Sequence, residues 1–228
     1  MTKKYFVLGS NSFSGANFCA HLKSQGCDVI AASRSPEPHN AFLPYKWDEN
    51  GNDVAFHQLD LNDDLEKIIQ LVKSEKPQII INFASQSMVG ESWLHPGDWF
   101  RTNALSTVLL HEELRKLSFI EKYVHISTPE VYGSTSGFVN EDHVMNPSTP
   151  YAVSRAAADM SLKSYFKAYE FPVVFTRAAN VYGEGQQLYR ILPRTILFAL
   201  TGKKLQLHGG GTSERSFIHI DDVSRATL

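Results

Sequence analysis

The stretch Tyr5-Phe-Val-Leu-Gly-Ser-Asn-Ser-Phe-Ser-Gly15 joins a short apolar run to the first amphipathic segment of the chain. Its first four residues predict a strand, and residues 15–24 predict a helix. A Gly-containing turn between them would let backbone N–H groups and the helix N-terminus approach a diphosphate. A third glycine is replaced by Ser12, so Ser12 either tolerates the turn or shifts it, and its hydroxyl could donate to phosphate. An ordinary strand-to-helix turn is the alternative.

Short apolar runs and longer amphipathic segments alternate along the rest of the chain. Strands are predicted over residues 5–8, 28–32, 54–59, 78–83, 122–127 and 173–177, and helices over residues 15–24, 65–74, 93–117 and 151–169. Residues 35–53 are rich in Pro, Asn and Asp and predict a long loop without a helix. This order indicates an α/β fold, a doubly wound parallel sheet of the Rossmann type.

The pattern changes near residue 179. We expect residues 1–178 to form a dinucleotide-binding domain and residues 179–228 to begin a smaller substrate-binding lobe. In this lobe we predict a helix over residues 189–200, strands over 205–207 and 216–220, and a last helix capped by Asp221 and Asp222. Because the chain ends at Leu228, just after this helix begins, we expect a carboxyl-terminal part to be missing.

Composition and charge limit the classes of partner, compartment and metal site that we expect. The chain has 228 residues, 43% of them hydrophobic, and its net charge of −2 comes with scattered basic residues, which argues against nucleic acid. Cys19 and Cys27 are the only cysteines, which fits a reducing compartment. No signal or membrane-spanning segment is visible, so we expect a cytoplasmic protein. The histidines lack the spacing of a metal site, and no metal is predicted.

The segment after the second predicted strand reads Ser33-Arg34-Ser35. Dinucleotide folds that bind NAD usually place a carboxylate there for the ribose 2′-hydroxyl. A guanidinium between hydroxyls instead suits a 2′-phosphate, so we predict NADP in preference to NAD, with NAD possible. Asp60, after the third strand, is placed to meet the adenine, although a carboxylate that caps the next helix is an equally simple explanation.

Two motifs follow the fifth predicted strand. Ser127-Thr-Pro-Glu130-Val-Tyr-Gly133 is a polar turn at the end of that strand, and Tyr151-Ala-Val-Ser-Arg155 opens the next helix. Both can face the crevice at the carboxyl ends of the strands, where ligands bind in such sheets. A tyrosine, a cation and a carboxylate near one nicotinamide indicate redox chemistry with a proton abstraction. The alternative is that Glu130 only caps or pairs locally.

Taken in order, these motifs resemble the extended short-chain dehydrogenase/reductase family, and within it the nucleotide-sugar 4,6-dehydratases and their epimerase relatives. The resemblance spans nearly the entire chain. It rests on the turn at Gly9 to Gly15, Asn82-Phe-Ala-Ser-Gln86, Asn103, the Thr128 to Gly133 turn, Tyr151, Arg177-Ala-Ala-Asn-Val-Tyr-Gly183 and Arg215-Ser-Phe-Ile-His-Ile-Asp-Asp222.

The resemblance implies a reaction. Tyr151 would take the proton of the sugar 4-hydroxyl while hydride leaves carbon 4, and Thr128 would hydrogen-bond the same hydroxyl. A free tyrosine has a pKa of about 10 and needs a nearby cation to act as a base. The usual cation is a lysine four residues later, where this chain has Arg155, which keeps the charge and could bond the nicotinamide ribose with altered geometry. Glu130 would remove the carbon 5 proton, the carbon 6 hydroxyl would leave as water, and hydride would return to carbon 6.

The resemblance also implies the binding residues. Those expected to contact the cofactor, besides Tyr151 and Arg155, are Gly9, Asn11, Ser12, Phe13, Gly15, Ser33, Arg34, Asp60, Leu61, Phe83, Ala84 and Ser85. Those expected to contact a nucleoside-diphosphate sugar are Gln86, Asn180, Arg190 and Arg215, with Asn180 and Arg215 on the pyrophosphate. Relatives commonly form homodimers through the helices that begin near Trp93 and Tyr151, so a homodimer is expected.

The chain departs from the family pattern in ways that leave alternatives open. Dehydratases for dTDP-glucose carry Asp where this chain has Pro129, although GDP-mannose-type dehydratases also lack that acid. A 4-epimerase would not need Glu130, and UDP-glucuronate decarboxylases carry a Glu in this turn. Ser12, Pro129, Arg155 and the early chain end also fit a protein of another class, a non-catalytic NADP-binding dimer.

Overall fold

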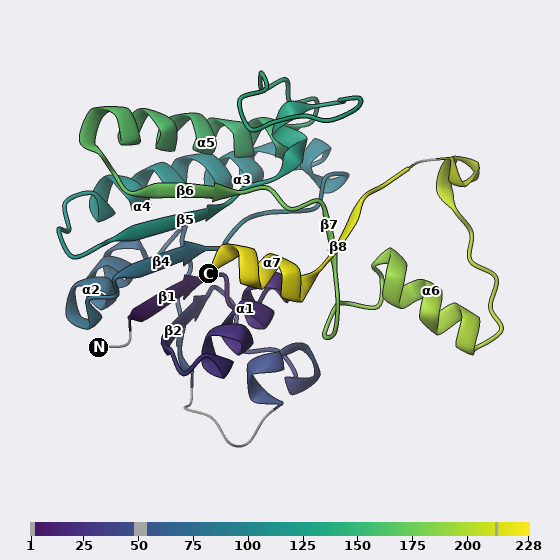
Figure 1. Cartoon of the computed structure of the whole chain (residues 1–228), viewed down its shortest axis with the longest axis horizontal. Coiled ribbons are helices and arrows are strands. Elements are labelled where there is room, and N and C mark those ends of the chain that lie inside the picture. The colour runs from purple at the N-terminus through teal and green to yellow at the C-terminus, as the bar shows by residue number, and fades with distance from the viewer. Residues whose placement is uncertain (1–2, 48–53, 213) are drawn as a thin grey trace.

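A computed structural model describes residues 3–47, 54–212 and 214–228 of the chain. Its centre is a six-stranded parallel sheet in the order β3-β2-β1-β4-β5-β6 (Figure 1). The strands are β1 (Lys4–Leu8), β2 (Asp28–Ser33), β3 (Ala55–Gln58), β4 (Ile79–Asn82), β5 (Lys122–Ile126) and β6 (Val173–Thr176). The doubly wound α/β fold is confirmed. The strand order reverses between β1 and β4, so a ligand crevice is expected beyond their carboxyl ends.

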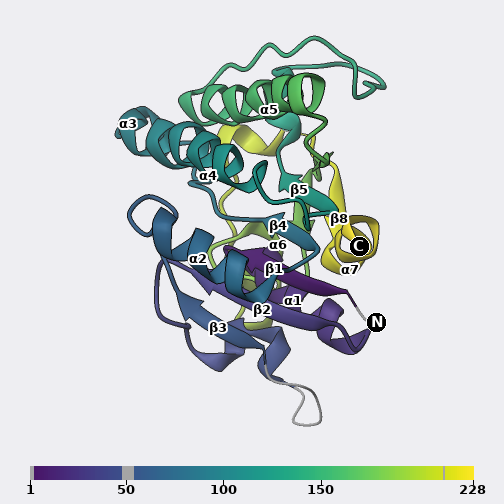
Figure 2. The ribbon, with the colours of Figure 1, turned by 90° about the vertical axis from the view of Figure 1, so that its left-hand side faces the viewer.

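The residues of each strand alternate between two cores. In β1, Phe6 and Leu8 enter one core together with Ile80 of β4, whereas Tyr5 and Val7 enter the other. Because both faces are covered, the strands are apolar throughout. The first core is closed by α2 (Leu65–Glu75), α4 (Thr107–Leu114) and α5 (Pro150–Tyr169), and the second by α1 (Phe13–Ser24). Figure 2 shows α7 (Ile220–Thr227) beside α1, and the two helices are in contact.

The predicted helix over residues 93–117 is instead divided. Residues Glu91–Trp93 form a single 3₁₀ turn, α3 (Pro96–Trp99) follows, and a π-helical segment, η4 (Phe100–Ser106), leads into α4. The break precedes Pro96, since a residue before proline disfavours the helical conformation, and His95 has φ −134° and ψ 58°. The wider turn of η4 contains Asn103, which is fully buried.

The predicted loop over residues 35–53 contains two short 3₁₀ helices, η1 (Asn40–Phe42) and η2 (Pro44–Lys46). The expectation of a loop without helix is therefore wrong there. Pro44 opens η2, and both Leu43 and Tyr45 are buried in the core against α1. Apolar residues within a polar segment thus find a partner that composition alone does not reveal. Residues 48–53 of the predicted loop lie outside the described residues.

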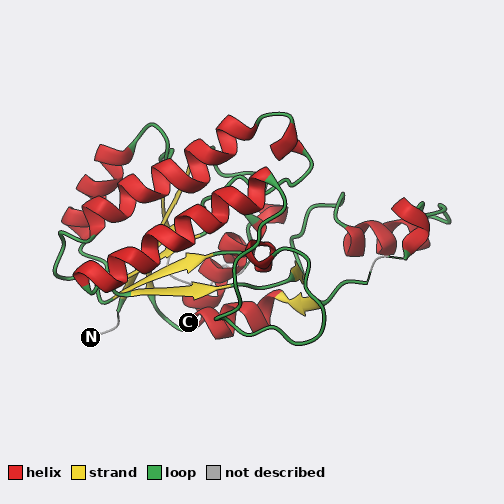
Figure 3. Ribbon diagram, turned by 90° about the horizontal axis from the view of Figure 1, so that it is seen from above, coloured by secondary structure: helices red, strands yellow, loops and turns green. Residues whose placement is uncertain are grey.

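The second, smaller unit is a two-stranded parallel pair. β7 (Asn180–Tyr182), which was not predicted, pairs with β8 (Phe217–His219), where a strand was expected. The predicted strand over residues 205–207 is irregular, because those residues have no neighbouring strand in the described chain. α6 (Ile191–Leu200), which lies between β7 and β8 in the sequence, buries none of its residues. Figures 1 and 3 show this helix apart from the sheet.

The residue that caps the last helix, α7, is not the one predicted from the sequence. The ring of His219 accepts a hydrogen bond from the Asp221 N–H at the start of α7. Asp221 and Asp222 were expected to cap this helix but lie inside its first turn, where negative charge favours the helix dipole. No helix in the described ranges is both long enough and apolar enough to cross a membrane.

Candidate active site

The loop between β1 and α1 is shaped by two glycines. Gly9 has φ +80°, and a Cβ atom there would lie 2.5 Å from the Ala84 backbone nitrogen. A Cβ atom on Gly15 would lie 2.3 Å from the Gly9 carbonyl oxygen. Both positions therefore require glycine. At Gly9 the backbone conformation and the close contacts both disfavour a side chain, and at Gly15 the close contacts alone do so. The loop consequently lies close against the segment that follows β4.

Ser12 shows why a third glycine is dispensable. Its φ of −71° and ψ of 154° are ordinary extended values that any L-residue adopts. Its Oγ accepts from the Gly15 N–H at 3.1 Å and donates to the Gly9 carbonyl at 2.7 Å. The expected donation from this hydroxyl to phosphate is therefore wrong, because its proton is bonded within the loop. Ser12 caps α1 and tolerates the turn.

The same loop fits a dinucleotide diphosphate. In the described chain the N–H groups of Phe13 and Ser14, at the start of α1, have no acceptor, and no acidic residue lies in the first turn. Among the described residues the buried hydroxyl of Ser10 also lacks a partner. Free donors at a helix N-terminus are where phosphate oxygens bind. These donors would suit a diphosphate, and the site expected from the sequence stays a prediction.

The rim of this loop is tied to the end of β2. The Asn11 N–H donates to the buried Ser33 hydroxyl at 2.9 Å, and its side-chain amide donates to the carbonyls of Ser35 and Pro36 at 2.9 and 3.0 Å. Arg34 is exposed between these residues. Asn11 and Ser33 thus act first on the loop itself, while the Arg34 guanidinium is left accessible to a ligand.

The residues expected to contact the cofactor after β3 and β4 differ in their hydrogen bonds and in their burial. The Asp60 carboxylate accepts from the Asn62 N–H at 2.8 Å and so closes its own turn, whereas the N-cap position of α2 is Asp64. The alternative that Asp60 caps this helix is therefore wrong. Leu61 and Phe83 are buried, Ala84 is half-buried, and Ser85 is exposed.

The turn after β5, residues 127–133, is called here the β5 turn. The buried Thr128 is the N-cap of a 3₁₀ helix, η5 (Pro129–Tyr132), and its Oγ1 accepts from the Glu130 N–H at 3.3 Å. Because Thr128 supplies the cap, the Glu130 carboxylate is not needed for it and makes no hydrogen bond in the described chain. The alternative that Glu130 itself caps or pairs locally is not what the structure adopts.

The Glu130 carboxyl is in a mixed electrostatic environment. Its side chain reaches the surface, yet the protein around the carboxyl raises the pKa above the usual value, and the Arg215 charge opposes this rise. Arg215 itself is exposed, with one guanidinium nitrogen bonded to the Glu214 carbonyl at 2.9 Å. The Arg215 charge therefore acts on the Glu130 carboxyl from a distant part of the chain, although no ion pair joins the two side chains in the described residues.

Tyr151 lies in the first turn of α5 and is 9% exposed. Thr149 caps this helix by accepting from the Ala152 N–H at 3.1 Å, and Pro150 takes the first helical position. The β5 turn packs against α5, with Val131 and Tyr132 in contact with Ala156. Tyr151 and Glu130 thus lie on two elements joined at the same end of the sheet.

Arg155 follows Tyr151 by one helical turn, but its guanidinium is directed into the interior. The side chain is 2% exposed, donates to the Ile126 carbonyl, and lies 3.3 Å from the His125 ring nitrogen. The expected bond from this guanidinium to a nicotinamide ribose is therefore not the arrangement found. An arginine is longer than lysine and carries several donors, so a backbone carbonyl in the core satisfies it.

Gln86 is held next to the first turn of α5 by Asn103. The Asn103 side chain accepts from the Gln86 N–H at 2.8 Å and donates to the Gln86 carbonyl at 3.0 Å. It also donates to the Ser154 hydroxyl at 3.0 Å, which in turn bonds the Tyr151 carbonyl at 2.7 Å. The π-helical turn thus joins a predicted substrate residue to the first turn of α5, and such turns are common at functional sites.

The other predicted substrate residues lie in the smaller unit. The Asn180 amide donates to the Ser216 carbonyl at 2.9 Å and so joins β7 to the segment before β8. Arg190 is exposed over the Tyr189 ring, 5.3 Å from its centroid. Neither was expected in these roles, and no described contact brings Arg190 to the β5 turn.

Sequence reasoning missed Asp159. This residue is fully buried on α5, and its carboxylate accepts from Ser127 and from Arg177. Its position four residues after Arg155 and eight after Tyr151 places all three on one helical face, which was a usable signal.

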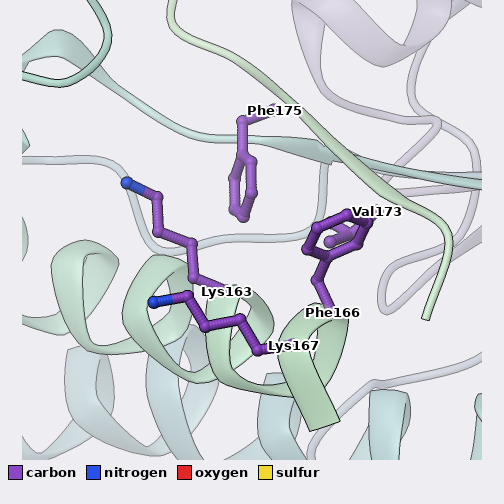
Figure 4. Close-up of a pocket in the computed structure, with 5 residues that line it drawn as sticks. All are labelled: Lys163, Phe166, Lys167, Val173 and Phe175. Carbon is purple, nitrogen blue, oxygen red and sulfur yellow. The ribbon is translucent and has the colours of Figure 1, made fainter. Parts of the chain in front are cut away.

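A pocket between α5 and β6 is a different place (Figure 4). Its lining residues are Lys163, Phe166, Lys167, Val173 and Phe175. Lys163 is twelve residues beyond Tyr151 in α5, a rise of about 18 Å along the helix. This pocket is therefore separate from the candidate site. The described residues contain no group of three or more His, Cys, Asp or Glu side chains that could hold a metal ion.

Comparisons with known proteins identify the family of this chain. A model of the NAD dependent epimerase/dehydratase family matches residues 5–228. The chain is 33% identical over 177 residues to the dTDP-D-glucose 4,6-dehydratase of Dictyostelium discoideum, which covers 72% of this chain but 40% of that protein. The chain thus spans less than half the length of this relative.

Two solved structures are similar over nearly the whole chain. The dTDP-glucose 4,6-dehydratase of Bacillus anthracis in complex with NAD has a TM-score of 0.86 and 30% identity, covering 99% of this chain and 70% of that one. The UDP-glucuronic acid 4-epimerase of Bacillus cereus, in complex with UDP-glucuronic acid and NAD, has a TM-score of 0.83 and 29% identity, covering 98% and 71%. With the family model matching almost every residue, this chain belongs to the NAD dependent epimerase/dehydratase family.

Proposed function

We propose that this chain acts on a nucleoside-diphosphate hexose as a 4,6-dehydratase. The observation that carries the proposal is the Glu130 carboxyl, which lies in the β5 turn without a hydrogen bond and with a raised pKa, on an element packed against the helix of Tyr151. A carboxylate so placed suits proton abstraction, because its base form is not consumed by a structural bond. The similarity to dehydratases of dTDP-glucose supports the same reaction.

Each residue has a proposed part in this reaction. Tyr151 accepts the proton of the sugar 4-hydroxyl, and Thr128 orients that hydroxyl from the end of β5. Glu130 removes the carbon 5 proton and passes it to the carbon 6 hydroxyl, which departs as water, and a proton from solvent later takes its place at carbon 5. Arg215 pairs with the substrate pyrophosphate, for which a guanidinium is suited. A nicotinamide cofactor, held by the β1–α1 loop, would supply the hydride acceptor for carbon 4 and the hydride donor for carbon 6.

The cofactor is proposed to bind along the β1–α1 loop. Similar solved structures contain NAD, whereas the preference for NADP rests on Arg34 and stays a prediction. The smaller unit is proposed to belong to a substrate-binding lobe. A cytoplasmic location also remains a prediction, based on the cysteines and the lack of a visible targeting segment.

A homodimer is proposed through the α4 and α5 side of the molecule. Leu105 and Leu109, in η4 and α4, are 56% and 45% exposed, and Met160 of α5 is 62% exposed. Apolar side chains gathered on adjacent helices favour burial against another surface, and a second copy offers the same apolar stripe.

A second candidate function is a non-catalytic dinucleotide-binding protein. The observation that favours it is Arg155, whose guanidinium is bonded to the Ile126 carbonyl in the core and not available beside Tyr151 in this arrangement. Arg155→Lys separates the two functions. Turnover that is absent in the natural chain and present in the lysine variant supports the non-catalytic function; turnover in both supports the dehydratase.

The dehydratase proposal is tested with Glu130→Gln. With NAD and dTDP-glucose, we expect water loss to fall by about 100-fold or more, the usual worth of a general base, while hydride transfer from carbon 4 continues and reduced nicotinamide accumulates. Glu141→Gln, an exposed residue farther along the same loop, is the matched control and keeps the natural rate. Water loss at the natural rate in Glu130→Gln would refute Glu130 as the base, whereas a product of unchanged mass in both proteins would favour a 4-epimerase, which needs no such base. Loss of carbon dioxide from UDP-glucuronate would favour a decarboxylase.

A further inference from the structure

The carboxylate of Asp159 collects three donors from two other elements. Its Oδ2 atom accepts from the Ser127 hydroxyl at 2.7 Å and from Nη2 and Nε of Arg177 at 2.7 and 3.2 Å. Asp159 is fully buried, and the Arg177 side chain is 11% exposed. The partners come from the end of β5 and the end of β6, so one side chain of α5 joins three elements of the site.

The first of these bonds controls the β5 turn. Ser127 directly precedes Thr128, whose hydroxyl holds the Glu130 N–H. A hydrogen bond from Ser127 to Asp159 therefore fixes the start of this turn relative to α5, the helix that carries Tyr151. Packing of Val131 against Ala156 holds the remainder of the turn but does not by itself set the position of its first residue.

The second bond, from Arg177 to Asp159, positions the segment that leads from β6 into the smaller unit. Residues 177–182, called here the lobe entry, run from β6 into β7. Arg177 is their first residue, and its guanidinium also lies 5.3 Å from the centroid of the Tyr132 ring in η5. The lobe entry is thus fastened to α5 and to the β5 turn at once. β7 in turn pairs with β8, just after Arg215.

Stability alone does not account for this arrangement. A buried ion pair usually contributes little net free energy compared with apolar side chains of the same volume, because both charges lose water. Its geometry is nevertheless narrow, since a guanidinium and a carboxylate bond well in few orientations. The network therefore suits the fixing of positions better than the filling of a core.

We propose that Asp159 is a positioning residue that holds the β5 turn and the lobe entry in register with Tyr151. This inference rests on the proposed function for the roles of Thr128, Glu130 and Tyr151. Its two arms are separable, since Ser127 serves the β5 turn and Arg177 serves the lobe entry. The first arm governs the chemical step, and the second governs the binding of the nucleoside-diphosphate sugar.

The test begins with hydrogen–deuterium exchange on the ligand-free protein, which needs no activity. We expect Ser127→Ala to raise exchange in residues 128–133, Arg177→Gln to raise it mainly in residues 177–182, and Asp159→Asn to raise it in both, with residues 9–16 unchanged. Asp98→Asn, an exposed aspartate on α3, is the control for the loss of one charge and changes neither segment. Unchanged exchange in Asp159→Asn, or a uniform rise along all of α5 and β5 in the three variants, would overturn the inference.

Kinetics with dTDP-glucose and NAD supply the functional readout. Ser127→Ala is expected to lower kcat by about tenfold to a hundredfold at constant KM, the cost of a small misplacement of catalytic groups. Arg177→Gln is expected to raise KM about tenfold with a smaller change in kcat, as for a lost bond to a charged group. Equal changes of kcat and KM in both variants would contradict separate arms. If the natural protein has no turnover but the exchange pattern holds, the proposed function fails and the positioning network stands.

Discussion

Replacing Gly9 by alanine should destabilise the fold and should also weaken dinucleotide binding under conditions where the variant is fully folded. Gly9 has φ +80°, which costs an L-residue about 1–2 kcal/mol. The new Cβ would also lie 2.5 Å from the Ala84 nitrogen and 2.7 Å from the Phe83 carbonyl carbon. These are backbone atoms, so the loop must retreat by about 1 Å to reach ordinary van der Waals separation. Such overpacking costs about 1–3 kcal/mol, and the two effects together lower the free energy of unfolding by about 2–5 kcal/mol.

The retreat moves the loop that presents the free N–H groups of Phe13 and Ser14. Loss of hydrogen bonds to a charged diphosphate is worth about 1.5–3 kcal/mol, or roughly tenfold to a hundredfold in the NADH dissociation constant. The assay is a titration of NADH fluorescence at a temperature where urea unfolding shows each variant to be folded.

The matched control is Gly26→Ala. Gly26 has φ +69° at the end of α1, but nothing lies within 4 Å of a Cβ atom there. It should lose about 1–2 kcal/mol of unfolding free energy from the backbone conformation and keep the natural NADH affinity. If Gly9→Ala, once folded, binds NADH with the natural dissociation constant, the assignment of the diphosphate to this loop is refuted.

Three further predictions concern the cofactor, the pH dependence of stability and the assembly. Arg34→Asp should weaken NADPH binding about tenfold or more and leave NADH less affected, and unchanged NADPH affinity would exclude a 2′-phosphate contact. Burial lowers the pKa of His111 to about 4, so the unfolded chain binds more protons below its usual pKa of 6.5. The free energy of unfolding should therefore fall as the pH drops from about 6.5 to 4, by up to about 3 kcal/mol for this group, and urea unfolding should show a smaller fall in His111→Asn. Met160→Glu should give a monomer in light scattering, whereas Leu200→Glu, at an even more exposed apolar residue of α6, should not, and a Met160→Glu dimer would exclude the α5 interface.

The sheet was predictable because its strands carry a strong local signal. In β1 and β4 the apolar residues divide between two cores, so short runs such as Tyr5 to Leu8 and Ile79 to Ile81 stand out from the polar segments around them. Gly9 and Gly15 were also predictable, since a strand-turn-helix order with close backbone approach requires them. The positions of Thr128 and Tyr151 followed from the same reasoning about strand ends.

The features that were not predicted depend on contacts between residues far apart in the sequence. β7 is three residues long and exists because it pairs with β8 across the whole of α6, which no local pattern encodes. The direction of Arg155 is set by a free carbonyl at Ile126 that only the packed structure offers. The spacing of Asp159 after Tyr151 and Arg155 places it on the same helical face, but its partners Ser127 and Arg177 are identified only in the folded structure, where they meet it in the core.

The interior position of Arg155 bears on how Tyr151 works. A tyrosine that acts as a base near neutral pH needs its phenolate stabilised. With the guanidinium bonded to Ile126, that stabilisation has to come from a change of the Arg155 side chain on ligand binding or from the ligand itself. The natural chain is therefore expected to be slower than its Arg155→Lys variant if the dehydratase proposal holds, and a slower lysine variant would contradict this account.

The measurement that tests the account most directly is mass spectrometry of the sugar product formed in deuterium oxide with NAD and a panel of nucleoside-diphosphate hexoses. If Glu130 removes the carbon 5 proton before hydride returns to carbon 6, solvent supplies the hydrogen that replaces it. The account predicts that one substrate loses the mass of a water molecule and gains one deuterium at carbon 5. Loss of water without deuterium at carbon 5, or conversion of a hexose with no change of mass in ordinary water, would contradict it.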